Sequence, residues 1–197
     1  AATLKLKNFE SSIGTSRKAY RLGKFLSGVN SIRKTPLRAP HALLEITSAG
    51  GDVIYYFTEQ LQWLVKTGVL PAHWAPTLTK FSAWGELVGY SASIWLTCLR
   101  MNTLTERELA LRRELFRRQR AGDGDAGVDK ALQEEIAGLR ARRVLRTLEL
   151  VQDLSDLLLA LADVRARGRL LHNDALLALA GLVSGSISAY KNWPGRK

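Results

Sequence analysis

Seven basic side chains and an apolar row share one short stretch of the chain, and their chemistry suits an anionic surface. Residues 11–44 contain seven Lys or Arg residues and no Asp or Glu. Apolar residues recur there at the spacing of one helix face, which predicts a basic amphipathic helix that binds a membrane surface or a partner. The apolar row is Leu22, Phe25, Leu26, Val29 and Ile32, and the basic residues are Arg17, Lys18, Arg21, Lys24, Arg33, Lys34 and Arg38.

Charge attraction and apolar burial are expected to act together against the cost of ordering the segment. Each basic residue near an anionic bilayer contributes about 1 kcal/mol, so seven give an upper bound of about 7 kcal/mol before salt screening. Each apolar side chain adds about 1.5–3 kcal/mol when it is fully buried at the headgroup boundary. These terms offset the lost conformational entropy. The alternative is an ordinary core row beneath a solvated basic face.

Other residue types that carry chemistry do not form a recognisable site. The three histidines lack the spacing of metal ligands, and Cys98 is the single cysteine. Four carboxylates share one helix face without a neighbouring histidine or nucleophile, which favours a solvated or interhelical acidic stripe over catalysis. The sequence therefore predicts no enzyme, cofactor or metal. The histidines are His41, His73 and His172, and the carboxylates are Glu149, Asp153, Asp156 and Asp163.

The net charge of +11 and the pI near 10.2 indicate an anionic partner, either lipid or nucleic acid. Arginines are dense in 112–120 and 140–146, but glutamates such as Glu108 and Glu114 interleave with them. That pattern predicts helix-face ion pairs, and no zinc knuckle or recognition-helix motif is present. No nucleic-acid partner is therefore expected, although a soluble nucleic-acid-binding helical protein stays as an alternative.

The elements that position these residues are predicted to be helices almost throughout. Hydrophobic periodicity, glycines and prolines place them at 12–32, 52–67, 79–101, 103–120, 129–164 and 173–192. The helix at 103 begins with an apparent capping box, Thr103-x-x-Glu106. We expect a membrane-binding segment at 9–40, aromatic, apolar and charged helices at 41–120, a flexible linker at 121–128, and amphipathic and apolar helices at 129–197.

Two apolar helices carry small residues at every fourth position, a pattern that lets helix backbones approach closely in membranes. We predict that these positions mediate helix packing or self-association. Residues 81–99 and 175–190 are marginal as membrane spans, because the first contains Glu86 and the second is short. The predicted chain is thus all-α and membrane-associated, with one or two marginally hydrophobic helices. The small-residue positions are Gly85, Gly89, Ser93, Gly181 and Gly185.

Several of these segments resemble the peroxin eleven family of peroxisomal membrane proteins, and the plant members most. Ser16-Arg-Lys-Ala-Tyr-Arg-Leu-Gly-Lys-Phe25 is similar to the family's basic segment. Trp63-Leu-Val-Lys-Thr-Gly-Val69 resembles a second signature, and the stretch from Gly181 to Tyr190 resembles the family's closing helix. These segments follow in the family's order. The resemblance also leads us to expect that the chain is the remainder of a longer protein.

The resemblance implies a peroxisomal membrane protein that elongates the membrane and prepares it for division. It implies lipid contacts at Arg17, Lys18, Arg21 and Lys24, with the apolar row as an inserted wedge. It further implies self-association and cooperation with a fission adaptor and the dynamin-related machinery. The alternative in the same membrane is a pore or solute conduit built from the small-residue helices.

Overall fold

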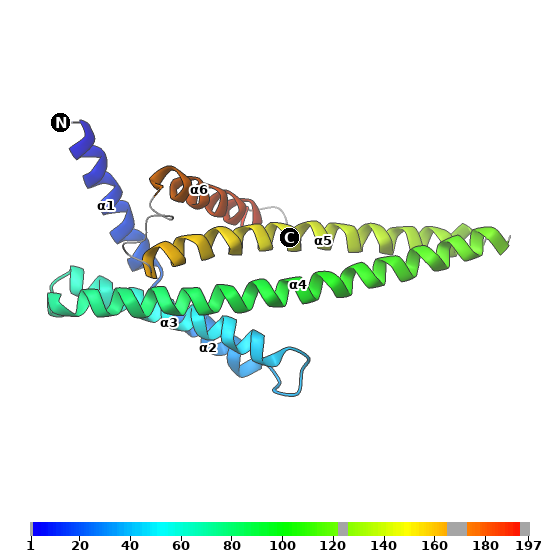
Figure 1. The fold of residues 1–197 in the computed structure, drawn as a ribbon, viewed down its shortest axis with the longest axis horizontal. Coiled ribbons are helices and arrows are strands. Elements are labelled where there is room, and N and C mark those ends of the chain that lie inside the picture. Colours follow the sequence, from blue (N-terminus) through cyan, green and yellow to red (C-terminus); the bar gives the residue numbers. More distant parts are fainter. Residues whose placement is uncertain (1, 122–125, 165–172, 194–197) are drawn as a thin grey trace.

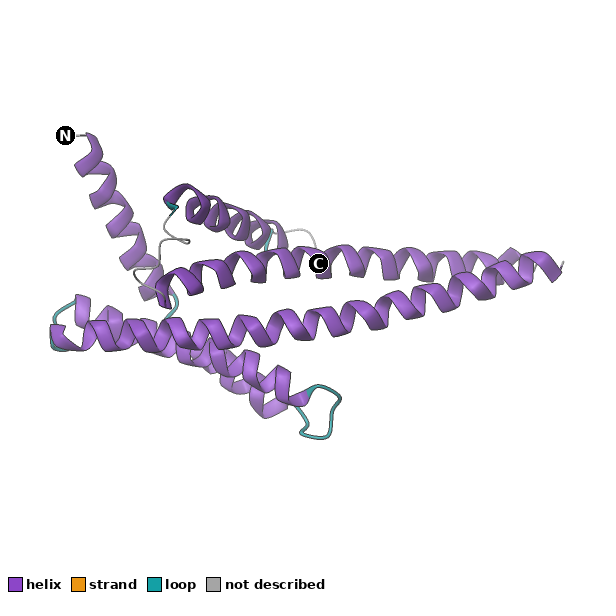
Figure 2. Ribbon diagram, in the orientation of Figure 1, coloured by secondary structure: helices purple, strands orange, loops and turns teal. Residues whose placement is uncertain are grey.

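The structure, a computed structural model, describes residues 2–121, 126–164 and 173–193. Every regular element in these ranges is helical, which confirms the all-α prediction (Figure 2). The elements are α1 (Ala2–Tyr20), α2 (Phe25–Lys34), α3 (Ala42–Lys66), the 3-10 helix η1 (Ala72–Trp74), α4 (Ala75–Ala121), α5 (Ala126–Val164) and α6 (Asp174–Lys191).

The molecule is built on two long antiparallel helices, α4 and α5 (Figure 1). Helix α3 packs along the first part of α4, and α2 packs on α3. Helix α6 lies along α5, while α1 contacts α3 and then projects away from the other helices (Figure 1). The bundle is therefore an open layer of helices, and large areas of most helices face outward.

The predicted single helix at 12–32 is wrong, because the chain turns between α1 and α2. Gly23 adopts a φ of +78°, a left-handed conformation that costs glycine little and other residues more. Turn hydrogen bonds, such as Lys24 N to Arg21 O at 3.0 Å, hold this break. The basic residues before the turn and the apolar residues after it consequently belong to different helices.

Two further helix predictions are wrong for identifiable reasons. Helix α3 begins at Ala42 rather than 52, because Gly50 and Gly51 lie inside a helix instead of ending one. The predicted helices 79–101 and 103–120 are one helix, α4, of 47 residues. No glycine or proline interrupts residues 90–121, so a change from apolar to charged composition does not end the helix. Thr103 is helix-interior, and its Oγ1 donates to Leu99 O at 3.2 Å instead of capping.

Helices α5 and α6 begin close to where the sequence places them. Helix α5 starts at Ala126 instead of 129, and residues 122–125 of the predicted linker lie outside the described residues. Helix α6 starts after Asn173, whose side chain accepts hydrogen bonds from Ala175 N at 3.1 Å and Leu176 N at 3.4 Å. An Asn cap satisfies amides that have no partner within the helix.

Three glycines allow α3 and α4 to cross at backbone contact. A Cβ on Gly51 of α3 would lie 2.5 Å from Gly89 Cα and 2.7 Å from Gly85 O. A Cβ on Gly89 would in turn lie 3.0 Å from Gly51 Cα. The predicted small-residue positions of α4 thus serve a crossing within the chain.

The far part of the α4–α5 hairpin is held by a carboxylate among guanidinium groups. Glu108 of α4 accepts hydrogen bonds from Arg112 Nε at 3.0 Å, Arg140 Nε at 3.1 Å and Arg143 Nη1 at 3.1 Å. Its side chain is only 4% exposed, because these arginine side chains themselves cover it. Hydrogen bonds from Arg112 and Arg140 hold the pKa of Glu108 below its usual value. Arg112, Arg140 and Arg143 are thereby engaged within the chain.

Candidate membrane-binding surface

The predicted apolar row, of which Leu22 precedes α2 and the rest lies on it, is divided between a packed side and an exposed side. The Phe25 ring meets the Phe57 ring of α3 edge-on, with centroids 5.5 Å apart. Gly28 lies against α3 closely enough that a Cβ there would reach Ala49 O at 3.1 Å. Three members of the row instead face outward. These are Leu22, Leu26 and Val29, with exposed fractions of 56%, 59% and 45%, whereas Phe25 and Ile32 are half-buried.

Three of the four basic residues predicted to contact lipid turn toward α3. Lys18 Nζ donates to Gln62 Oε1 at 3.1 Å, and Arg21 pairs with Glu59 at 3.5 Å. Lys24 lies over the Tyr56 ring, with Nζ 4.3 Å from its centroid, a cation–π contact. The side chain of Arg17 lies outside the described residues. Sequence spacing could not reveal this arrangement, because the partners are about 40 residues away along the chain.

A second outward apolar surface runs along α4 and is not predicted by the sequence pattern alone. Phe81, Trp84, Val88 and Trp95 are each about half exposed or more. Their spacings of three, four and seven residues place them on one helix face. The periodicity is visible in the sequence, but the apolar length of residues 81–99 directs attention to a membrane span instead of a one-sided surface. No helix in the described parts of the chain is both long and apolar enough to cross a bilayer.

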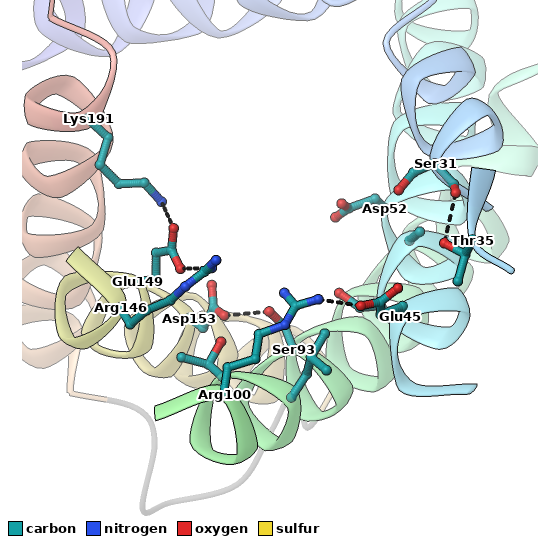
Figure 3. Close-up of a pocket in the computed structure, with 14 residues that line it drawn as sticks. Ser31, Thr35, Glu45, Asp52, Ser93, Arg100, Arg146, Glu149, Asp153 and Lys191 are labelled. Carbon is teal, nitrogen blue, oxygen red and sulfur yellow. Dashed lines mark hydrogen bonds and ion pairs between the residues drawn. The ribbon is translucent and has the colours of Figure 1, made fainter. Parts of the chain in front are cut away.

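The opposite faces of the same helices line an open polar cavity of about 390 Å³ (Figure 3). Helix α2 contributes Ser31, α3 contributes Asp52, and α4 contributes Ser93. An α-helix turns 100° per residue, so each of these polar residues lies nearly opposite an exposed apolar residue of its own helix. The pairs are Ser31 and Leu26 on α2, Asp52 and Phe57 on α3, and Ser93 and Trp95 on α4. The three helices are therefore polar on the inner side of the layer and apolar on the outer side.

Charged pairs line the wall of this cavity (Figure 3). Ser93 Oγ of α4 donates to Asp153 Oδ2 of α5 at 2.6 Å. Glu149 of α5 accepts from Arg146 Nη1 at 2.6 Å and lies 3.7 Å from Lys191 Nζ of α6. These contacts join α4, α5 and α6 through polar groups. The predicted acidic stripe of α5 is thus partly interhelical.

The acidic groups of the inner side are held toward their neutral forms. Loss of hydration raises the pKa of Asp153, Asp156 and Asp163 above the usual value. The same cause, reinforced by Asp163 and Asp156, raises the pKa of Glu86 to about 8. No group of three or more His, Cys, Asp or Glu side chains within the described ranges is arranged to hold a metal ion. These acidic groups make the inner side of the helices polar.

The remaining predicted packing residues divide between α4 and α6. Gly85 and Gly89 are buried at the α3–α4 crossing, and Ser93 is bonded to Asp153. Gly181 and Gly185 of α6 are exposed, and a Cβ on either would meet nothing within 4 Å. Any surface for a second copy that uses these glycines is consequently on α6.

Comparison with known proteins identifies close relatives along the whole described chain. The family model of Peroxisomal biogenesis factor 11 (PEX11) matches residues 1–193. Peroxisomal membrane protein 11-3 of Oryza sativa subsp. japonica is 40% identical over 196 residues, which cover 98% of this chain and 74% of the relative. Peroxisomal membrane protein 11A of Arabidopsis thaliana is 37% identical, covering 96% of this chain and 75% of the relative. No solved structure matches the chain.

Proposed function

Because the chain belongs to the Peroxisomal biogenesis factor 11 (PEX11) family, we propose that it remodels the peroxisomal membrane by inserting its outer apolar surface into the cytosolic leaflet. It is a non-enzymatic peroxisomal membrane protein whose family acts in peroxisome biogenesis. In this proposal, insertion elongates the membrane ahead of division.

One observation carries the proposal, namely that three neighbouring helices expose apolar rows away from a polar interior. Water-soluble domains bury such rows, and large exposed apolar patches mark lipid or partner surfaces. Leu22 before α2 and Leu26 and Val29 on α2 are exposed, and α2 packs on α3, which exposes Phe57. Helix α4, which packs on α3, adds the exposed Trp84 and Trp95. An apolar surface of this kind lies in the plane of a leaflet, at the headgroup boundary.

Insertion into one leaflet supplies the mechanical step. Side chains that enter the outer leaflet enlarge its area relative to the inner leaflet, and the mismatch favours a curved, tubular membrane. Basic residues at and after the end of α2 attract the anionic surface, because Lys34 and Arg38 are exposed and have no acidic partner among the described side chains. In this account residues 9–40 form the membrane-binding segment, while Lys18, Arg21 and Lys24 hold it on α3.

Division partners belong to the same proposal. Self-association would concentrate many inserted surfaces at one place, and Gly181 and Gly185 offer an exposed small-residue face for it. A fission adaptor and dynamin-related proteins would then act on the elongated membrane. Crosslinking of the full chain in vesicles, with Gly181→Leu/Gly185→Leu included, tests the self-association step.

The insertion mechanism is tested by flotation of the full chain with vesicles of increasing anionic lipid content. We expect Leu22→Asp/Leu26→Asp to lower the fraction of protein bound by at least about tenfold, because each buried leucine contributes about 1.5–3 kcal/mol. The matched control is Ser27→Asp/Asn30→Asp, which adds the same charge to exposed polar positions of α2. Its binding should fall only slightly.

Vesicle shape and leakage separate the mechanism from its alternatives. Tubes that form with the unmodified chain and disappear with Leu22→Asp/Leu26→Asp support insertion. Equal losses in the two double variants would contradict it. Release of an entrapped dye without a change of vesicle shape would favour a solute conduit. Binding of RNA with a steep salt dependence, in place of vesicles, would favour the nucleic-acid alternative.

A further inference from the structure

A second cavity, of about 420 Å³, lies between α4 and α5 on the hairpin. Four of its lining residues are arginines, against a single carboxylate, Glu149. Leu104 of α4 and Leu145 of α5 add an apolar part to the wall. The arginines are Arg100 and Arg107 of α4 and Arg142 and Arg146 of α5. The cavity is therefore strongly cationic, and its size suits a small ligand.

Two of these four guanidinium groups already hold carboxylates. Arg100 pairs with Glu45 of α3, and Arg146 pairs with Glu149 within α5 (Figure 3). These pairs also line the neighbouring polar cavity, so they form the partition between the two cavities. They fix part of the cavity wall, and the other two arginines of the wall, Arg107 and Arg142, are exposed.

Arg107 and Arg142 have no carboxylate within 4.0 Å among the described residues. The neighbouring Glu108 does not serve them, because its oxygens are occupied by Arg112, Arg140 and Arg143. Glu108 of α4 bonds to Arg140 and Arg143 of α5, so the adjacent position 107 lies near position 142, and both line the cavity. Two like charges at one cavity repel each other unless an anion joins them.

We propose that this cavity binds a phosphate monoester, held between the guanidinium groups of Arg107 and Arg142. A guanidinium presents parallel N–H donors that match two phosphate oxygens, and such charge-assisted hydrogen bonds are the strong ones. Leu104 and Leu145 would contact the carbon skeleton that carries the phosphate. The same chemistry is offered by a lipid headgroup and by a free sugar or inositol phosphate. The site does not depend on insertion of α2.

The test measures binding of inositol 1,4-bisphosphate to the purified full chain by calorimetry, and flotation with phosphatidylcholine vesicles that contain phosphatidylinositol 4-phosphate. Arg107→Gln/Arg142→Gln should weaken binding about a hundredfold, because removing each charge-assisted hydrogen bond weakens binding about tenfold. Arg113→Gln/Arg117→Gln removes the same charge from exposed positions of α4 outside the cavity and should change binding little.

Thermal unfolding provides a readout that a purely structural role would not move. The bisphosphate should raise the melting temperature of the unmodified chain and of the control, but not of Arg107→Gln/Arg142→Gln. Saturable binding of the free bisphosphate would show that the cavity binds a soluble phosphate. Binding only to the phosphoinositide vesicles would show that it binds a lipid headgroup. Absence of both, or equal weakening in the two double variants, overturns the proposal.

Discussion

Replacing Gly51 with alanine is expected to destabilise the protein by about 1–3 kcal/mol, the usual cost of forcing an extra methyl group into close packing. The new Cβ would lie 2.5 Å from Gly89 Cα, so the two helix backbones must separate. Alanine is intrinsically better than glycine in a helix by about 1 kcal/mol, which acts against the destabilisation but does not remove the backbone clash. The measurement is thermal unfolding followed by circular dichroism.

Two neighbouring glycines turn this result into a graded series. Gly50→Ala on the same helix meets nothing within 4 Å, so it should leave stability unchanged or raise it. Gly85→Ala meets the Ile54 side chain at 2.7 Å, which can shift, so its effect should be intermediate. Equal melting temperatures for the Gly50 and Gly51 variants would show that α3 and α4 do not cross at this point.

The stability of the protein is expected to fall as the pH rises from about 4.5 to about 8. Glu86 titrates near its ordinary value of 4.5 when the chain is unfolded, whereas in the folded state its pKa is raised to about 8. Between these values the unfolded chain releases a proton that the folded chain retains, so ionisation favours unfolding. Asp153, Asp156 and Asp163 act in the same direction, because burial also raises each pKa.

Chemical denaturation of Glu86→Gln tests whether Glu86 causes the fall of stability with rising pH. The variant cannot ionise at this position, so the free energy of unfolding should depend less on pH and exceed that of the unmodified chain at pH 8. Glu114→Gln is the control, because Glu114 is exposed and its partner Arg118 lies on the same helix surface. An identical pH slope for Glu86→Gln and the unmodified chain would contradict a raised pKa at Glu86.

Sequence periodicity predicts the helical class because each helix carries its own apolar face, whatever it packs against. It predicts helix ends well where a local cap decides them, as at Asn173. It places the start of α3 wrongly and predicts a break within α4 that does not exist, because glycines and changes of charge resemble boundaries. Gly50 and Gly51 lie within α3, and Gly51 supports a crossing whose partner, Gly89, is far along the chain.

The candidate surface was predictable only in part, for a related reason. The apolar row is visible from spacing, and Leu22, Leu26 and Val29 are indeed exposed. Which basic residues stay available for lipid depends on tertiary partners, because Glu59, Gln62 and Tyr56 engage three of the predicted lipid-binding residues. The outer face of α4 becomes recognisable only once α3 and α5 are seen to cover its other sides.

The most direct test of lipid insertion is the quenching of tryptophan fluorescence by lipids brominated near the headgroup end of the acyl chain. A full chain that retains only Trp95, on the outer face of α4, is compared with one that retains only Trp63. Trp63 is half-buried and shares the polar side of α3 with Glu59, one helical turn away. The account predicts strong quenching of Trp95 and weak quenching of Trp63 in vesicle-bound protein. Equal quenching of the two, or none for Trp95, would contradict it.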